Sequence, residues 1–287
     1  MREAQATLAR ACAVVGLDAR GATLLKFGEN ATYLLSNGTI VARISAGLDL
    51  APQAARELRV TEWLRRHGVP AARPAEAAGQ PIVVGDSLVT FWEAVRASLQ
   101  PPTPEQLAGA LLRLHAVPVP DGLASIDPLW IVERRVRSEG STAEREVILR
   151  RCDQLREAYD RLEFSGSPRV VHGDAHVHNL LRDDAGTVVL MDLEHSGTGP
   201  REWDLVPTAT HDVLGWRPRG EYRAFAEAYG VDVTTSPTFG VMNAMRELLM
   251  LSFLMRRARS DTRVAAEVRR RVVTIRDDIV PRGWVAF

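Results

Sequence analysis

The chain has 287 residues, of which 46% are hydrophobic and 25% charged, and this composition suits one large globular domain or two intimate lobes. Lys and Arg together number 36, as do Asp and Glu, so the formal net charge is zero and no basic excess indicates a nucleic-acid partner or an anionic membrane surface. The two cysteines, Cys12 and Cys152, fit no disulfide framework and no metal-ligand spacing, and they are predicted to be free, mostly buried thiols in a reducing cytoplasm.

The N-terminal third of the chain is predicted to combine helices with short strands. Helical patterns cover 2–15 and 51–67, and the second pattern is amphipathic. Extended segments are expected at 22–27, 32–36 and 39–44, with two more strands within 81–95. The Asn37-Gly38 pair between the second and third segments is a strong hairpin signal. A β-rich unit is therefore expected here.

The rest of the chain is predicted to be mainly helical. The proline-rich segment 96–105 is expected to connect it to the first third, which places the boundary near 93–105. Helices are expected over 104–117, over 141–164 with Ser141 or Thr142 as N-cap, and over most of 219–280. The segment 180–194 predicts a strand, a turn and a second strand.

Two apolar stretches are candidates for targeting or membrane segments, and neither fits. Residues 11–17 are short and flanked by charged residues, which argues against a secretory signal. The most apolar window, 241–255, is interrupted by Arg246 and Glu247 and is too short to span a bilayer. We therefore expect a buried core helix at 241–255 and a cytoplasmic protein without a membrane partner.

The stretch VVHGDAHVHNLL, residues 170–181, concentrates polar side chains beside apolar pairs. One interpretation is the zinc site of a hydrolase, made by His172, His176 and His178, because catalytic zinc is bound by histidine and carboxylate ligands. The remaining histidines lie in no recognisable ligand pattern, which weakens this interpretation.

The other interpretation is a phosphoryl-transfer loop. Asp174 is followed five residues later by Asn179, which is the offset between the catalytic aspartate and the metal-binding asparagine of protein kinases. Asp192 ends a predicted hairpin whose first strand begins directly after Asn179. Because a hairpin returns its end to its start, Asn179 and Asp192 are expected to converge on one metal ion.

With these motifs the chain resembles the aminoglycoside phosphotransferase family, which shares a bilobal fold with the protein kinases and includes choline kinase-like relatives. The segments that carry the resemblance are His172-Gly173-Asp174-Ala175-His176-Val177-His178-Asn179, Met191-Asp192-Leu193-Glu194 and Pro200-Arg201-Glu202-Trp203-Asp204-Leu205. The resemblance implies an α+β, protein-kinase-like fold. Its small β-rich N-terminal lobe would span 1–95 and bind nucleotide, with a hinge at about 90–95. Its larger helical lobe would span 96–287 and hold the catalytic loop and the acceptor site.

The resemblance assigns roles in the helical lobe. Asp174 would accept or orient the proton of the substrate hydroxyl, while Asn179 and Asp192 would hold Mg²⁺, a hard ion that takes oxygen ligands. His172 and Asp204 would support the loop. At position 178 a histidine replaces the small residue that the family usually carries.

It also assigns nucleotide-binding roles in the N-terminal lobe. The loop 27–33 would cover the phosphates through its backbone and through Asn30 and Thr32, although an ordinary hairpin turn is an alternative. Arg43 stands where the family carries a phosphate-binding lysine, and an arginine can keep that role because it is always charged and can fork onto two oxygens. Its ion-pair partner would be Glu57, with Glu62 as a rival.

The hinge would receive the nucleobase of ATP or GTP through backbone groups of Glu93 and Val95. Trp92 is expected in the core, with a place in the wall of the base pocket as the alternative. Glu194 would assist a second metal ion or contact the acceptor, with a solvated surface glutamate as the alternative, and Glu202 would be a candidate carboxylate for a cationic acceptor. Further carboxylates in this half of the chain are Asp212, Glu221, Glu227 and Glu247.

The expected activity is transfer of the γ-phosphate of ATP or GTP to a hydroxyl of an antibiotic of aminoglycoside, macrolide or cyclic-peptide type, which would confer resistance. The alternatives are a kinase of a small metabolite, such as an amino alcohol or a sugar, and a non-catalytic kinase-like binding protein. The combination of Asp174, Asn179 and Asp192 argues against the last.

Overall fold

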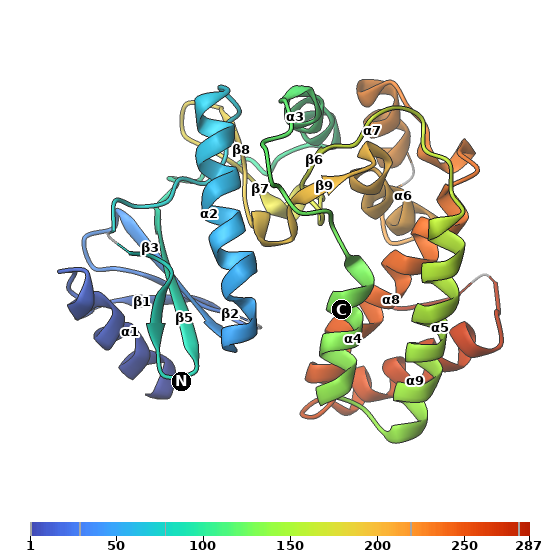
Figure 1. The fold of residues 1–287 in the computed structure, drawn as a ribbon, viewed down its shortest axis with the longest axis horizontal. Coiled ribbons are helices and arrows are strands. Elements are labelled where there is room, and N and C mark those ends of the chain that lie inside the picture. The colour runs from blue at the N-terminus through green and yellow to red at the C-terminus, as the bar shows by residue number, and fades with distance from the viewer. Residues whose placement is uncertain (1, 29, 78, 219, 281) are drawn as a thin grey trace.

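The computed structural model of the protein describes residues 2–28, 30–77, 79–218, 220–280 and 282–287. It shows a small lobe built on an antiparallel sheet beside a larger lobe that is mainly helical (Figure 1). The predicted bilobal α+β fold is therefore confirmed.

The sheet of the small lobe has the strand order β1-β2-β3-β5-β4, and all neighbouring strands are antiparallel. The strands are β1 (Thr23–Phe27), β2 (Asn30–Leu34), β3 (Ile40–Ala46), β4 (Ile82–Val84) and β5 (Ser87–Glu93). The predicted Asn37-Gly38 turn joins β2 to β3. Gly38 has φ 69° there, a conformation that glycine adopts without strain.

Two helices accompany the sheet. Helix α1 (Arg2–Val14) covers one face, where Leu8 and Cys12 pack with Tyr33 and Phe91 in the core of the small lobe. Helix α2 (Ala51–Arg66) lies between the sheet and the larger lobe (Figure 1).

Helix α2 contacts both lobes. Its Val60 and Leu64 are buried in the core of the larger lobe, while its Glu57 pairs with Arg43 of β3. The helix therefore places Glu57 at the junction of the two lobes.

The larger lobe is built from helices around one apolar core. They are α3 (Pro104–Ala116), α4 (Pro128–Ser138), α5 (Thr142–Asp160), α6 (Val206–Val213), α7 (Glu221–Tyr229), α8 (Phe239–Arg257) and α9 (Thr262–Arg276). Ser141 caps α5, and Cys12 and Cys152 are both free and buried, as predicted. None of the described helices is both long and apolar enough to cross a membrane.

The structure corrects parts of the secondary-structure prediction. Helices α4 and α6 were not predicted; α4 starts at Pro128, after Asp127 accepts a hydrogen bond from the backbone of Trp130 at 3.0 Å. The helix predicted over 141–164 ends at Asp160, where the backbone tightens into a turn. Arg219, the first residue of the predicted helical stretch 219–280, lies outside the described residues.

Short strands of the larger lobe position the loop at 172–179, which carries the clustered polar side chains. Strands β7 (Leu180–Arg182) and β8 (Val188–Leu190) form the predicted hairpin, and the backbone N–H of Met191 donates to the carbonyl of Asn179 at 2.9 Å. The hairpin thus brings the two ends of the segment 179–192 together. A second pair, β6 (Arg169–Val171) with β9 (Gly197–Gly199), holds the start of the loop.

Candidate active site

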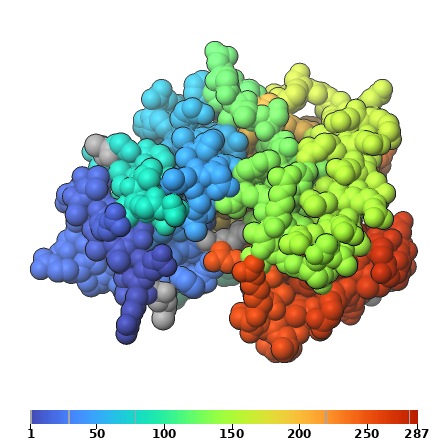
Figure 2. Space-filling model, turned by 60° about the horizontal axis from the view of Figure 1, so that its bottom comes forward, coloured from blue at the N-terminus to red at the C-terminus, as the bar shows by residue number. Residues whose placement is uncertain are grey.

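A cleft of about 1140 Å³ opens between the lobes. In the space-filling view the N-terminal lobe, from blue to cyan, and the helical lobe, from green to red, meet along a seam (Figure 2). The sequence-predicted residues that line the cleft are Asn30, Thr32, Arg43, Glu57, Trp92, Glu93, Val95, Asp174, His176, His178, Asn179, Asp192 and Glu194. His172, Asp204, Glu202 and Glu62 are not part of its lining.

Asp174 lies in the cleft at the start of the loop. Its Oδ1 is 2.5 Å from Nη1 of Arg246 on α8, and its Oδ2 is 3.6 Å from Nε2 of His176. Burial alone would raise the pKa of Asp174. The charge of Arg246, together with the hydrogen bond and charge of His176, holds that pKa well below its usual value. Asp174 is therefore ionised and able to accept a proton or a hydrogen bond.

Neutralising Arg246 by Arg246→Gln is expected to raise the pKa of Asp174, because burial is then opposed by less positive charge. Since a carboxylate with a low pKa stays active down to low pH, the acid limb of the pH profile of kcat/KM should move to higher pH in this variant. The profile of Arg257→Gln, an exposed arginine about three turns further along α8, should overlay that of the wild type. Identical profiles for Arg246→Gln and the wild type would show that Arg246 does not lower the pKa of Asp174.

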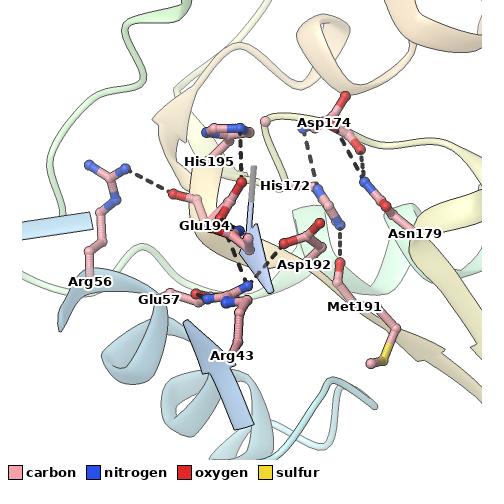
Figure 3. Close-up of polar contacts among 12 residues, drawn as sticks. Arg43, Arg56, Glu57, His172, Asp174, Asn179, Met191, Asp192, Glu194 and His195 are labelled. Atoms are coloured by element: carbon pink, nitrogen blue, oxygen red, sulfur yellow. Dashed lines mark hydrogen bonds and ion pairs between the residues drawn. The ribbon is translucent and has the colours of Figure 1, made fainter. Parts of the chain in front are cut away.

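His172 connects the loop at 172–179 to the strand end that carries Asp192. Its Nε2 donates to the carbonyl of Met191 at 2.9 Å, and its Nδ1 accepts from the backbone N–H of Asp174 at 3.3 Å (Figure 3). Burial lowers the pKa of His172, which keeps the ring neutral as an acceptor at Nδ1 requires. These contacts suit a supporting side chain and leave no ring nitrogen for a metal.

Asp204 holds the other side of the loop. It is fully buried, and its carboxylate accepts hydrogen bonds from the backbone N–H groups of His172 at 2.7 Å and Gly173 at 2.9 Å. His115 of α3 bonds the same carboxylate at 2.9 Å and is itself bonded to Tyr229 at 2.7 Å. The loop is thereby anchored to two helices.

Gly173 cannot carry a side chain in this arrangement. Its φ is 86°, and a Cβ built on it would lie 2.1 Å from the carbonyl oxygen of His195. We expect Gly173→Ala to destabilise the fold by about 1–3 kcal/mol more than Gly186→Ala. Gly186 has φ 85° but no atom within 3.6 Å of the added Cβ, so this control isolates the backbone strain, about 1–2 kcal/mol.

Denaturant midpoints of the two glycine variants measure the difference. Equal midpoints would show that the loop can move away from His195, and the tight packing described for Gly173 would then be wrong.

Asn179 and Asp192 line the cleft, and they lie at the two ends of the hairpin (Figure 3). The amide nitrogen of Asn179 donates to the carbonyl of Asp174 at 2.8 Å, and no described residue donates to its Oδ1. Asp192 has φ 56°, a left-handed conformation that is uncommon for aspartate and often marks a functional site. One of its oxygens is 3.0 Å from Arg43, and the other has no such contact with the described residues.

Arg43 lies among carboxylates. It pairs with Glu57 and with Asp192, and its Nη1 is 3.9 Å from Glu194 (Figure 3). Burial raises the pKa of Glu57 to about 7, although the charge of Arg43 opposes the shift. Glu62 instead pairs with Arg65 and Arg66 on the exposed side of α2, so it is not the partner of Arg43. With three carboxylates around one guanidinium, this corner of the cleft favours a further cation.

The oxygen donors fit a hard cation. Asn179 and Asp192 each offer an oxygen without a described hydrogen-bond donor, and Mg²⁺ is commonly held by one or two carboxylate or amide ligands together with phosphates and water. The described residues contain no group of three or more His, Cys, Asp or Glu able to hold a metal ion by themselves.

The strand that ends at Glu93 supplies the edge of the cleft next to the connector. The backbone N–H of Glu93 donates to Arg73 and that of Ala94 to Thr39, both at 2.8 Å. No described residue accepts from the backbone N–H of Val95, so Val95 has the free donor that a nucleobase would need. Trp92 is buried as predicted, yet it also borders the cleft, with Arg43 over its ring at 5.3 Å.

The β1–β2 turn forms the edge nearest the proposed phosphate site. Gly28, Asn30 and Thr32 line the cleft, and Asn30 donates to Glu194 at 3.2 Å across the lobes. Glu29, within the predicted phosphate loop, lies outside the described residues.

The sequence matches the model described as the phosphotransferase enzyme family (APH) over residues 24–248. The chain belongs to this family. The matched segment holds the sheet, the loop at 172–179 and Asp192. No curated protein matches the chain at a significant level.

Solved structures with the fold of the phosphotransferase enzyme family include several small-molecule kinases. The amicoumacin kinase hAmiN, solved with AMP-PNP and Ca²⁺, has a TM-score of 0.73 at 19% identity, covering 98% of this chain and 97% of its own. A microcompartment-associated aminopropanol kinase has a TM-score of 0.68 at 20% identity, covering 99% of both chains. The spectinomycin phosphotransferase APH(9)-Ia, solved with ADP and spectinomycin, has a TM-score of 0.62 at 16% identity, covering 97% and 95%.

Membership of the phosphotransferase enzyme family and the geometry both argue against the zinc interpretation. Both ring nitrogens of His172 are bonded to the backbone, and His178 contacts Arg217 at 3.2 Å. His176 approaches Asp174 and the ring of His178, but the three imidazoles do not share a metal position.

Two site residues of this family member were missed from the sequence. Arg246 was seen only as an interruption of an apolar window, although a charge inside such a helix is a signal that the helix meets a polar site. His115 gave no signal, because its partner Asp204 lies 89 residues away in the chain.

Proposed function

We propose that the protein transfers the γ-phosphate of ATP or GTP to a hydroxyl group of a small molecule, in the first instance an antibiotic. The observation that carries the proposal is the arrangement of Asp174, Asn179, Asp192 and Arg43 around one cleft, although they come from distant parts of the chain. Use of ATP or GTP fits action in the cytoplasm.

In the proposed reaction the acceptor hydroxyl faces Asp174. Its oxygen forms a bond to the γ-phosphorus as the bond from that phosphorus to the β–γ bridging oxygen breaks, and the hydroxyl proton passes to the Asp174 carboxylate. Arg246 holds that carboxylate at 2.5 Å, and the amide of Asn179 donates to it at 3.4 Å. Bound at Asn179 and Asp192, Mg²⁺ would neutralise charge on the phosphates. Positioning is the main contribution of the protein, because the transition state is loose.

Arg43 is proposed to bind the phosphates. Arg43→Ala should weaken nucleotide binding by about 10- to 100-fold, because hydrogen bonds to charged groups contribute about 1.5–3 kcal/mol. Arg43→Lys should lose less nucleotide affinity, since lysine keeps the positive charge but lacks the planar guanidinium that donates to two oxygens at once. Titration calorimetry with a non-hydrolysable nucleotide measures the affinity, with Arg59→Ala on the exposed face of α2 as control. Unchanged nucleotide affinity in Arg43→Ala would show that Arg43 does not bind the phosphates.

The antibiotic as acceptor is supported by two similar folds, the amicoumacin kinase and the spectinomycin phosphotransferase. A second candidate is a metabolite kinase, supported by the aminopropanol kinase, whose fold is similar over nearly the whole chain. Resistance would follow from the first activity and not from the second.

The two candidates are separated by incubating the protein with Mg²⁺, ATP or GTP and a panel of compounds, and by searching for one added phosphate with mass spectrometry. Expression in a sensitive host then tests protection. Phosphorylation of an amino alcohol or sugar, without protection against any antibiotic, would favour the metabolite kinase. Nucleotide binding without transfer to any hydroxyl would favour a non-catalytic binding protein.

A further inference from the structure

The wall of the cleft formed by α4 and α8 has the wrong charge for a polycation. Among the described residues of these two helices, every charged side chain that lines the cleft is an arginine, namely Arg134, Arg135, Arg246 or Arg256. Asp127 lines the cleft just before α4, but it is bonded to Arg156 at 3.2 Å. Arg134 is likewise paired with Asp49, so the positive charge of this wall comes mainly from the other three arginines. An acceptor with several ammonium groups would meet like charge here.

The carboxylates that the sequence suggested for a cationic acceptor, other than Glu194, do not line the cleft; they are Glu202, Asp212, Glu221, Glu227 and Glu247. Glu202 is buried and accepts a hydrogen bond from Ser165 at 2.8 Å. Glu247 is buried and pairs with Arg282 at 3.0 Å. The expectation that Glu202 contacts the acceptor is therefore not met.

Arg246 has unused hydrogen-bonding capacity at the reaction centre. Its side chain is 9% exposed, and Nη1, bonded to Asp174, is the one atom of its guanidinium with a hydrogen bond to a described residue. Its Nε is buried and has no hydrogen-bond partner among the residues that the structure describes. A guanidinium has five N–H donors, and leaving buried donors unpaired costs free energy that a bound anion would recover.

The same wall is apolar beyond Arg246. Trp130 and Ile131 of α4 and Leu249, Met250 and Phe253 of α8 line it. Trp130 is 36% exposed and Phe253 is 44% exposed, although both are large hydrophobic side chains. Exposed apolar surface inside a cleft is characteristic of a site for an apolar ligand.

We propose that the acceptor is an amphiphilic hydroxy acid, with its carboxylate on Arg246, its hydroxyl at Asp174 and its apolar body against α4 and α8. This inference rests on the phosphotransferase activity proposed above. Because Arg246 and Asp174 are in direct contact, the carboxylate must lie within a few bonds of the reacting hydroxyl. The product is then the phosphate ester of the hydroxy acid, formed by the transfer step already described.

Three matched probes test the inference: 3-hydroxydecanoate, its amide, and 1-aminodecan-3-ol, which carries an ammonium group instead. Binding is measured by calorimetry with AMP-PNP and Mg²⁺ present, so the result does not depend on turnover. We expect the acid to bind at least about tenfold more tightly than the amide, as hydrogen bonds to a charged group allow, and the amine to bind most weakly.

Variants then assign the preference to Arg246. Arg246→Gln should bind acid and amide about equally, Arg246→Lys should keep part of the preference, and Arg257→Gln should keep all of it. Thermal unfolding shows whether each variant is folded. The inference is overturned if the wild type binds the amine as tightly as the acid, if the acid does not bind, or if Arg246→Gln retains the preference.

Transfer assays with the same probes and with a polycationic aminoglycoside separate this inference from the proposed function. Phosphorylation of the aminoglycoside alone would support the proposed phosphotransferase activity and contradict the hydroxy acid as its acceptor. Preferential binding of the acid without transfer to any acceptor would support the proposed hydroxy-acid site and contradict the proposed phosphotransferase activity.

Discussion

Replacing Asp174 by asparagine is expected to lower kcat for phosphoryl transfer by about 10²- to 10⁴-fold, the usual contribution of a positioned general base. Asparagine has nearly the same shape, its one side-chain oxygen can still accept from Arg246, and Asn179 keeps its hydrogen bond to the backbone carbonyl of residue 174. The loop should therefore stay in place, while the chemistry fails because an amide cannot take the proton. Nucleotide affinity should be almost unchanged, because the residues proposed to bind the phosphates and the base are intact. Single-turnover transfer and calorimetry with AMP-PNP measure the two effects separately.

Asp184→Asn is the control for this experiment. Asp184 is an exposed aspartate in the β7–β8 turn, close to the loop in the chain, and does not line the cleft. Its replacement should leave kcat unchanged. If Asp174→Asn turned over at a rate near that of the wild type, Asp174 would not be the base.

The second large effect is expected at Asp192. Asp192→Asn removes a negative charge from the proposed metal site but keeps a side chain that tolerates the left-handed backbone, φ 56°. Because the metal's electrostatic contribution is worth several kcal/mol, we expect kcat/KM to fall by about 10²-fold or more, with a higher Mg²⁺ concentration needed for half-maximal rate.

Asp278→Asn matches this change in chemistry and in backbone. Asp278 also has a positive φ, 49°, and its side chain is 78% exposed on the surface, apart from the cleft. It should behave as the wild type. A Mg²⁺ dependence in Asp192→Asn equal to that of the wild type would exclude Asp192 as a ligand.

Local sequence signals predicted the parts of the fold that depend on neighbouring residues. The Asn37-Gly38 pair fixed a turn through backbone preference, and Ser141 capped α5 through a contact three residues away. The offset from Asp174 to Asn179 and the hairpin to Asp192 span few residues, so their meeting could be argued from the sequence. Helix α4 was missed, because its N-cap lies in a region rich in loop-forming residues.

Contacts across long stretches of chain could not be read from local patterns. Arg246 reaches Asp174 from a helix 72 residues away, and Asn30 reaches Glu194 across 164 residues. The charge of the cleft wall formed by α4 and α8 could not be predicted for the same reason. A count of carboxylates in the C-terminal half did not show which side chains face the cleft. Glu202 and Glu247 are turned into the protein, while arginines line the wall.

We propose that Asn179 and Asp192 hold the metal of a nucleotide whose terminal phosphate faces Asp174. A crystal structure with AMP-PNP and Mn²⁺ tests it most directly, because the anomalous signal locates the metal independently of the refined coordinates. We expect a peak about 2.0–2.6 Å from Asn179 Oδ1 and from an Asp192 oxygen, with the γ-phosphate between the metal and Asp174. Nucleotide bound in the cleft with the metal away from both residues would show that Asn179 and Asp192 are not its ligands.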